Sequence, residues 1–214
     1  MYLFPKWVNG SGLAIAIGAL ALPAYLGGLL WYGASPKAMD VGYKPTQPIE
    51  YSHALHAGKL GIDCRYCHTA VESAPHAAIP SAQTCMGCHT NLRGDSPKLE
   101  ELRKRFNDGM PIEWVRVHDI SDFAYFDHSA HVNRGVGCVE CHGRVDRMEK
   151  VFQAQPLSMA WCLDCHRNPD ARLRPPELVT KMDWSADAQQ TQWAEKFRKT
   201  HNINPKQDCS TCHR

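Results

Sequence analysis

The sequence has no long apolar run after Pro36, no strong excess of either charge, and no cysteine outside one repeated pattern. The missing apolar runs exclude the large aliphatic core that a globular chain of 214 residues normally buries. The balance of 24 basic against 22 acidic residues does not suggest binding to nucleic acid. Something other than aliphatic side chains must therefore fill the interior of residues 38–214.

The cysteines show what that filling is. All ten fall into Cys-x-x-Cys pairs, and a histidine follows each pair directly. This motif attaches c-type haem: the two thiols form thioethers, and the imidazole binds the iron from one side, as the proximal ligand. The predicted thioether cysteines are Cys64, Cys67, Cys85, Cys88, Cys138, Cys141, Cys162, Cys165, Cys209 and Cys212. The predicted proximal ligands are His68, His89, His142, His166 and His213. With no spare cysteine, the pattern predicts five haem c groups.

Three other uses of paired cysteines fit less well. Zinc ribbons have no need of a histidine after every pair. A disulfide scaffold would not keep one spacing five times, and thioredoxin-like dithiols occur once per βαβ unit. The predicted fold class is therefore a multihaem cytochrome c, built of mostly short helices and loops wrapped around five haems, with little sheet and one N-terminal transmembrane helix.

The exception to the polar pattern is an uncharged stretch over residues 7–36. Residues 13–33 read LAIAIGALALPAYLGGLLWYG and would span about 31 Å as a helix, enough to cross a bilayer core. Aromatic residues flank both ends, as in the two interfacial belts of membrane helices: Tyr2, Phe4, Trp7, Trp31 and Tyr32. The alternative is a cleaved signal peptide, but its apolar core would have only about 7–15 residues.

These observations predict an anchor over residues 1–37 and a pentahaem domain over 38–214. Haem is attached to Cys-x-x-Cys-His outside the bacterial cytoplasm. We therefore expect a single-pass protein of the inner (cytoplasmic) membrane, with its haem domain on the periplasmic side.

The polar part contains an internal repeat. Tyr51-Ser-His-Ala-Leu-His56 precedes the first haem motif, and Phe126-Asp-His-Ser-Ala-His131 precedes the third. A second Cys-x-x-Cys-His motif follows in each copy. Residues 51–89 and 126–166 are therefore predicted to be two copies of a two-haem module, called here the first and second modules, and residues 201–214 carry the fifth haem.

Seven further histidines can supply the second axial, or distal, ligands. In each His-x-x-His pair we expect the first histidine to serve the haem that follows it: His53 that of His68, and His128 that of His142. The second histidines, His56 and His131, would reach a different haem and so join neighbouring haems into one conducting cluster. The remaining candidates are His118, His76, His201 and Met159. A His/Met iron would have a higher potential than a bis-His iron.

Three connecting segments also have recognisable patterns. Ser96-Pro97 predicts the start of a helix that runs through Phe106, and residues 112–117 (IEWVRV) predict a short strand. Residues 186–199 predict an amphipathic helix with Trp193 and Phe197 on one face.

Four strings in this order resemble the pentahaem cytochrome c component of Alternative Complex III. They are YSHALHAGKLGIDCRYCH (51–68), HAAIPSAQTCMGCH (76–89), PIEWVRVHDISDFAYFDHSAHV (111–132) and PLSMAWCLDCHRNP (156–169). The resemblance covers roughly residues 45–170. It implies a quinol:electron-acceptor oxidoreductase complex of respiratory or photosynthetic chains. The implied partners are an iron–sulfur subunit related to molybdopterin enzymes, integral quinol-binding subunits and a monohaem cytochrome c.

Two classes of function remain after this. One is an electron-transfer subunit with six-coordinate haems and no catalytic residue of its own. The other is a multihaem reductase, of the nitrite or hydroxylamine type, which needs an open iron. Seven extra histidines can close five sites, so the sequence favours electron transfer. Within that class, the alternative to Alternative Complex III is another family of membrane-anchored multihaem quinol dehydrogenases.

Overall fold

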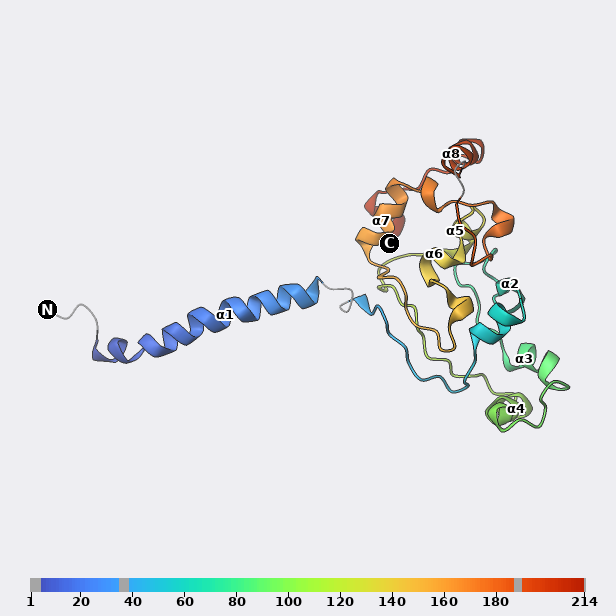
Figure 1. The fold of residues 1–214 in the computed structure, drawn as a ribbon, viewed down its shortest axis with the longest axis horizontal. Helices are drawn as coiled ribbons and strands as arrows, with labels where there is room; N and C mark the ends of the chain where they lie inside the picture. Colours follow the sequence, from blue (N-terminus) through green and yellow to red (C-terminus); the bar gives the residue numbers. More distant parts are fainter. Residues whose placement is uncertain (1–4, 35–38, 187–189, 214) are drawn as a thin grey trace. The chain divides into compact units, whose positions relative to one another are not determined.

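The computed structural model describes residues 5–34, 39–186 and 190–213 (Figure 1). The chain divides into two compact units, Met1–Val41 and Gly42–Arg214, each of which is described by itself.

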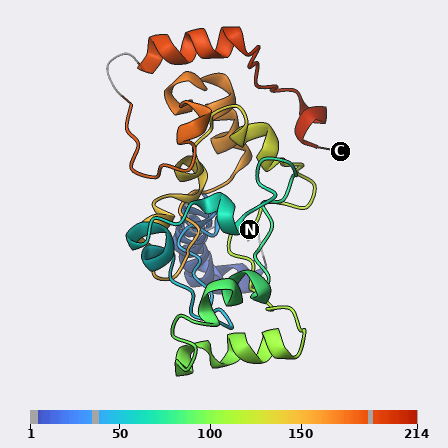
Figure 2. The same ribbon diagram turned by 90° about the vertical axis from the view of Figure 1, so that its right-hand side faces the viewer.

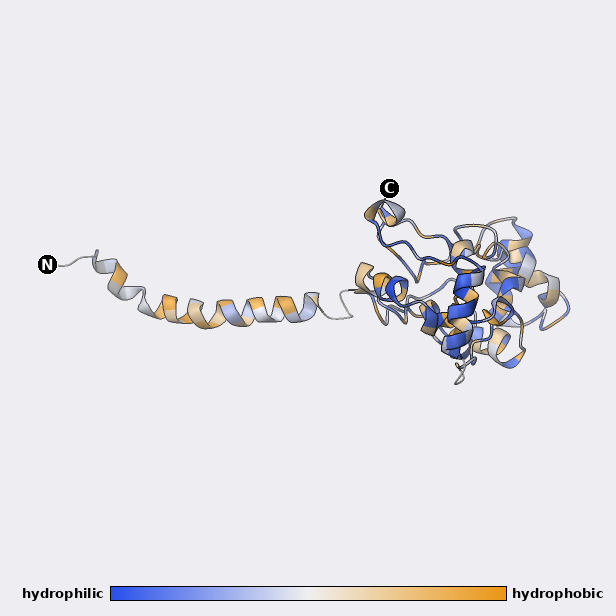
Figure 3. Cartoon of the chain, turned by 90° about the horizontal axis from the view of Figure 1, so that it is seen from above, coloured by the Kyte–Doolittle hydropathy of each residue, from blue (hydrophilic) through white to orange (hydrophobic). Residues whose placement is uncertain are grey.

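The first unit is dominated by one apolar helix. The short 3-10 helix η1 (Lys6–Gly10) precedes α1 (Gly12–Gly33), whose 22 residues span about 33 Å. None of the α1 residues is buried, and Figure 3 shows apolar residues along its length. By length and composition α1 could cross a membrane, and Pro23 lies inside it without ending it. Of the flanking aromatic residues, Tyr2 and Phe4 lie outside the described residues, whereas Trp7 and Trp31 are exposed.

The second unit consists of short helices joined by loops (Figures 1 and 2). The α-helices are α2 (Cys64–Cys67), α3 (Ala82–His89), α4 (Glu100–Asn107), α5 (His128–Val132), α6 (Cys138–His142), α7 (Met159–Arg167), α8 (Gln190–Thr200) and α9 (Cys209–Cys212). The unit also contains the π-helix η3 (Ala54–Lys59) and the 3-10 helices η4 (Pro97–Leu99), η5 (Val145–Arg147), η6 (Asp170–Arg172) and η7 (Pro176–Leu178). Helices α4 and α8 lie at opposite ends of this unit in both views.

The described part of the chain has no strand, only one isolated bridge between Val136 and Leu173. Its aliphatic core is small, as the composition predicted. One buried cluster joins Ile49, Ala82, Met86, Leu102 and Ile112, and a second joins Val71, Val132 and Val179.

Two of the three predicted connecting elements are present. Pro97 opens η4, which continues into α4 to Asn107, close to the predicted end at Phe106. The C-terminal helix α8 begins at Gln190; the predicted start at Ala186 precedes residues 187–189, which lie outside the described residues. Trp193 and Phe197 stack on its surface with ring centroids 4.8 Å apart.

The strand predicted over residues 112–117 was wrong. An alternating pattern becomes a strand only where a second backbone completes its hydrogen bonds. Here a side chain does so instead: the Gln47 amide donates to the Val115 carbonyl (2.8 Å) and its oxygen accepts from the Val115 N–H (2.9 Å).

The two modules pack against each other through matched contacts. The residue after the first histidine of each module, Ala54 or Ser129, donates its N–H to a carbonyl of the other module. The acceptors are Met148 (3.0 Å) and Ala74 (3.3 Å), which stand at the same offset after the first cysteine of their modules. The exchange relates the modules by an approximate two-fold axis, the arrangement of an isologous interface within one chain.

A second matched pair of contacts follows the same relation. Asn133 donates its side-chain amide to the Glu72 carbonyl (2.9 Å). At the equivalent place Gly58 approaches the Asp146 carbonyl so closely that a Cβ on Gly58 would overlap it. The sequence predicted the duplication, and the structure adds how the copies face each other.

Candidate functional site

The five Cys-x-x-Cys-His motifs each lie on a short helix. A helical turn places residues three apart on the same face, so both thiols of each pair point the same way. Side chains cap several of these helices at their N-terminus. Asp63 accepts from the Arg65 N–H (2.9 Å), Ser158 from the Trp161 N–H (3.3 Å), and Asp208 from the Thr211 N–H (3.2 Å). None of the ten cysteines forms a disulfide with another.

Most of the histidines share one hydrogen-bonding arrangement. In seven of them Nδ1 lies within 2.6–3.1 Å of a backbone carbonyl: His56, His68, His89, His128, His131, His166 and His213. A carbonyl only accepts, so Nδ1 must carry the proton and donate. This leaves the Nε2 lone pair for a metal, the second-shell arrangement typical of metal-bound histidines.

The histidines also come together in pairs at a suitable separation. A metal-bound imidazole nitrogen lies about 2 Å from the ion, and about 1.2 Å from its own ring centroid, so two imidazoles on opposite sides of one ion have centroids about 6.4 Å apart. Three pairs in the structure have this separation. They are His56–His89 (6.1 Å), His128–His142 (6.3 Å) and His131–His166 (6.2 Å). The residues present therefore fit iron held between two imidazoles.

A denser group of imidazoles lies where the modules meet. The rings of His118 and His142 are 4.4 Å apart at 82°, too close for the two to bind opposite sides of one iron. Burial and, to a smaller extent, neighbouring imidazoles lower the pKa of His142 to about 3 and that of His53 to about 4. Both rings are therefore neutral at pH 7, with a lone pair to offer. His53 Nδ1 and His118 Nε2 are buried without a hydrogen-bond partner.

The remaining candidates are less closely placed. Within the described residues, no ring contact joins His68 or His213 to another histidine. The ring centroids of His201 and Phe197 lie 4.3 Å apart. Met159 is the first residue of α7, and 62% of its surface is exposed. Burial is the largest cause of the lowered pKa of His53, and the charge of His68 is the next. The two imidazoles are therefore neighbours.

The first attachment sites of the two modules meet near the two-fold axis. The side chains of Cys64 and Cys138 are neighbours, and this proximity lowers the pKa of Cys64 and raises that of Cys138. Other thiol neighbours join the remaining sites in turn: Cys67 with Cys85, Cys141 with Cys165, and Cys162 with Cys212. The five sites therefore form a continuous series, with the second and fifth motifs at its ends.

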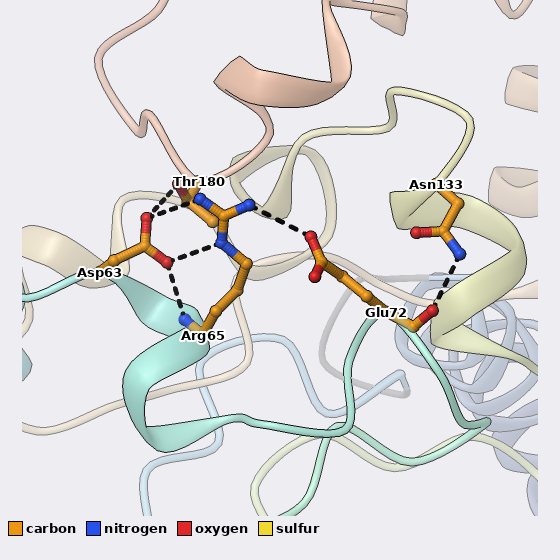
Figure 4. Close-up of polar contacts among 5 residues, drawn as sticks. All are labelled: Asp63, Arg65, Glu72, Asn133 and Thr180. Carbon is orange, nitrogen blue, oxygen red and sulfur yellow. Dashed lines mark hydrogen bonds and ion pairs between the residues drawn. The ribbon is translucent and has the colours of Figure 1, made fainter.

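Polar contacts join the first motif to the rest of its own module and to the segment after the second module (Figure 4). Arg65, inside the motif, donates Nε to Asp63 (2.9 Å) and Nη1 to Glu72 (3.1 Å). The Thr180 hydroxyl donates to Asp63 (2.8 Å) from the segment after the second module. The Arg65 hydrogen bonds lower the pKa of Asp63 to about 2.

Two features of the site were not predicted. Arg174 is fully buried and pairs with Glu140, which lies between Cys138 and Cys141 (2.5 Å). Tyr51 and Phe126 each contact both histidines of their module. The only signal for the second feature was an aromatic residue two positions before each His-x-x-His pair.

The short helices, the absence of a strand among the described residues and the repeated motif are typical of multihaem cytochromes c, a class whose members bind haem c covalently and act in electron transport. Residues 124–214 match the family model described as cytochrome c7 and related cytochrome c. The chain is also similar to the multiheme cytochrome c subunit of a menaquinone reductase from Nitratidesulfovibrio vulgaris. The two are 27% identical over 175 residues, which cover 78% of this chain and 77% of that one.

Proposed function

We propose that this chain is the electron-transfer subunit of a membrane quinol:electron-acceptor oxidoreductase. It carries five haem c groups on the ten cysteines and the five histidines that follow them, and passes electrons from a quinol site to a periplasmic acceptor. The observation that carries this proposal is the set of three histidine pairs separated by 6.1–6.3 Å. Iron closed on both sides suits electron transfer, whereas a reductase needs an open position.

The distal ligands follow from those pairs. His56 serves the haem attached before His89, His131 that before His166, and His128 that before His142. The pairs His56–His89 and His131–His166 each join the start of a module to its second haem motif. This supports the prediction that the second histidine of each His-x-x-His pair connects neighbouring haems.

Two irons have more than one candidate. The haem attached before His68 has two candidates for its distal ligand, and both lie near the module interface. They are His53 and His118, whose buried Nε2 has no hydrogen-bond partner. For the haem of His213, the candidates are His76, His201 and Met159.

The assignment to an Alternative Complex III-like assembly rests on the sequence resemblance. The partners would be an iron–sulfur/molybdopterin-like subunit, quinol-binding integral membrane subunits and a monohaem cytochrome c. Residues 1–37 would anchor the chain in the inner membrane, and residues 38–214 would lie in the periplasm. The described relative belongs to a menaquinone reductase, so electron flow toward the quinone is the second candidate.

Purification of the native membrane complex tests both candidates. Mass spectrometry of the co-purified polypeptides identifies the partners, and haem absorbance follows electron flow. Reduction of oxidised haems by menaquinol supports the quinol oxidoreductase, whereas oxidation of pre-reduced haems by menaquinone at the faster rate supports the reductase. Turnover of nitrite or hydroxylamine, with no exchange with quinones, would contradict both.

A further inference from the structure

The two His-x-x-His pairs are held by aromatic rings in nearly the same geometry. Tyr51 lies 4.7 Å from His53 at 88° and 4.5 Å from His56 at 23°. In the second module, Phe126 lies 4.8 Å from His128 at 84° and 4.6 Å from His131 at 28°. Each aromatic ring therefore meets its first imidazole edge-on and stacks on its second, both favourable aromatic geometries.

A second contact completes the orientation of the stacked imidazole. His56 donates Nδ1–H to the Ser52 carbonyl (2.8 Å), and His131 donates to the Asp127 carbonyl (2.7 Å). The hydrogen bond and the stacked ring together define the plane and direction of the imidazole. Its Nε2 is left free of that hydrogen bond, and its ring centroid lies 6.1 Å from that of His89 in the first module and 6.2 Å from that of His166 in the second.

We propose that Tyr51 and Phe126 are positioning residues that turn the two imidazoles of each pair toward two different irons. The proposal rests on the proposed function, which supplies those irons. Without the ring, the two imidazoles, only three residues apart, could rotate toward the same side.

Comparison of the two modules distinguishes the role of the aromatic ring from that of the tyrosine hydroxyl. One copy has tyrosine and the other phenylalanine, yet the four ring angles agree within a few degrees. Ordinary filling of space would not need the same angles twice. The shared property is the aromatic face, so the hydroxyl of Tyr51 is dispensable for positioning.

The test compares leucine and aromatic replacements in the full-length protein. Tyr51→Leu and Phe126→Leu remove the ring but keep most of its apolar volume. Tyr51→Phe and Phe126→Tyr exchange the two ring types, and Phe106→Leu removes a ring from the buried cluster near α4 as a matched control. The readouts are covalent haem count by intact mass and the low-spin signals in electron paramagnetic resonance. Signals are assigned with His56→Ala, His128→Ala and His131→Ala.

The expected pattern is reciprocal. Phe126→Leu shifts or abolishes the low-spin signals of the His128–His142 and His131–His166 pairs and leaves that of His56–His89 unchanged. Tyr51→Leu shifts or abolishes the low-spin signal of the His56–His89 pair and leaves those of the His128–His142 and His131–His166 pairs unchanged. The two exchange variants and Phe106→Leu match the parent, and all variants keep the parent's haem count, because attachment depends on the cysteines.

Three results would overturn the proposal: leucine variants with the parent's spectrum, the same change in both modules, or loss of covalent haem from either leucine variant. Failure of the proposed function looks different. In that case the parent protein itself would lack covalent haems or would show no low-spin iron.

Discussion

Replacing Glu140 by glutamine should destabilise the protein by about 2–4 kcal/mol, because it leaves a buried charge unpaired. Glu140 lies inside the third haem motif, and its partner Arg174 has a side chain only 1% exposed. Removing one partner of a buried ion pair costs about 3–5 kcal/mol. The amide oxygen of the glutamine can still accept one hydrogen bond from Arg174, worth about 1 kcal/mol, which reduces the loss.

Other contacts of Arg174 survive the substitution and keep the loss in this range. Its Nη1 donates to the Lys181 carbonyl (3.2 Å), and its guanidinium lies 4.5 Å from the Trp184 ring centroid. Arg172 reaches the same carboxylate from 3.7 Å and retains its second partner, Asp164 (3.4 Å).

The assay is denaturant unfolding of the holoprotein in detergent, followed by Soret absorbance and tryptophan fluorescence. Asp119→Asn is the matched control, because it breaks an exposed pair with Arg116 that should contribute about 0–1 kcal/mol. The double variant Glu140→Gln/Arg174→Met should recover stability relative to Glu140→Gln, since it removes the unpaired charge itself. A loss for Glu140→Gln no larger than the control, or a double variant less stable than the single one, would refute this reasoning.

Three further predictions concern haem stoichiometry, acid stability and a close backbone approach. Intact-mass spectrometry should show five covalent haems added to the 24.0 kDa chain, and four or fewer, or bound zinc, would contradict the pentahaem assignment. Because the pKa of Asp63 is lowered to about 2, its ionised form stabilises the fold fully above about pH 4, and this contribution is lost as the pH falls through about 2. Asp63→Asn should therefore flatten the fall in unfolding free energy over that window, and an unchanged slope would count against the Arg65 contacts. Gly135→Ala should lower the melting temperature markedly, because Gly135 has a φ of +80° and a Cβ there would overlap the Arg174 carbonyl; a parent-like melting curve would argue against this packing.

Local patterns predicted the parts of the fold that depend on nearby residues. The apolar stretch of α1, the Pro97 helix start and the short helices of the haem motifs all follow from spacing and composition. The strand over residues 112–117 failed because strand formation depends on a distant partner, and here Gln47 satisfies Val115 from another segment.

The site shows the same division between local and distant information. The repeated motif predicted which histidines belong to a pair, since the duplication is visible in the chain. It could not predict that His118 would lie beside His142, or that Arg174 would pair with Glu140, because those contacts join segments that only the folded chain brings together. Their residue types alone are common on protein surfaces.

The duplicated geometry also shows which half of each site is constant. The aromatic ring and the distal imidazole keep the same mutual angles in both modules, as do the exchanged backbone contacts at the two-fold axis. The proximal side differs: the rings of His56 and His89 meet at 69°, and those of His131 and His166 at 40°. Helices α3 and α7 carry His89 and His166 at different spacings from the first motif of their modules, and this difference accompanies the change in ring angle. The duplication thus preserves the contact of each aromatic ring with its two histidines, while the histidine of each second motif has its own orientation.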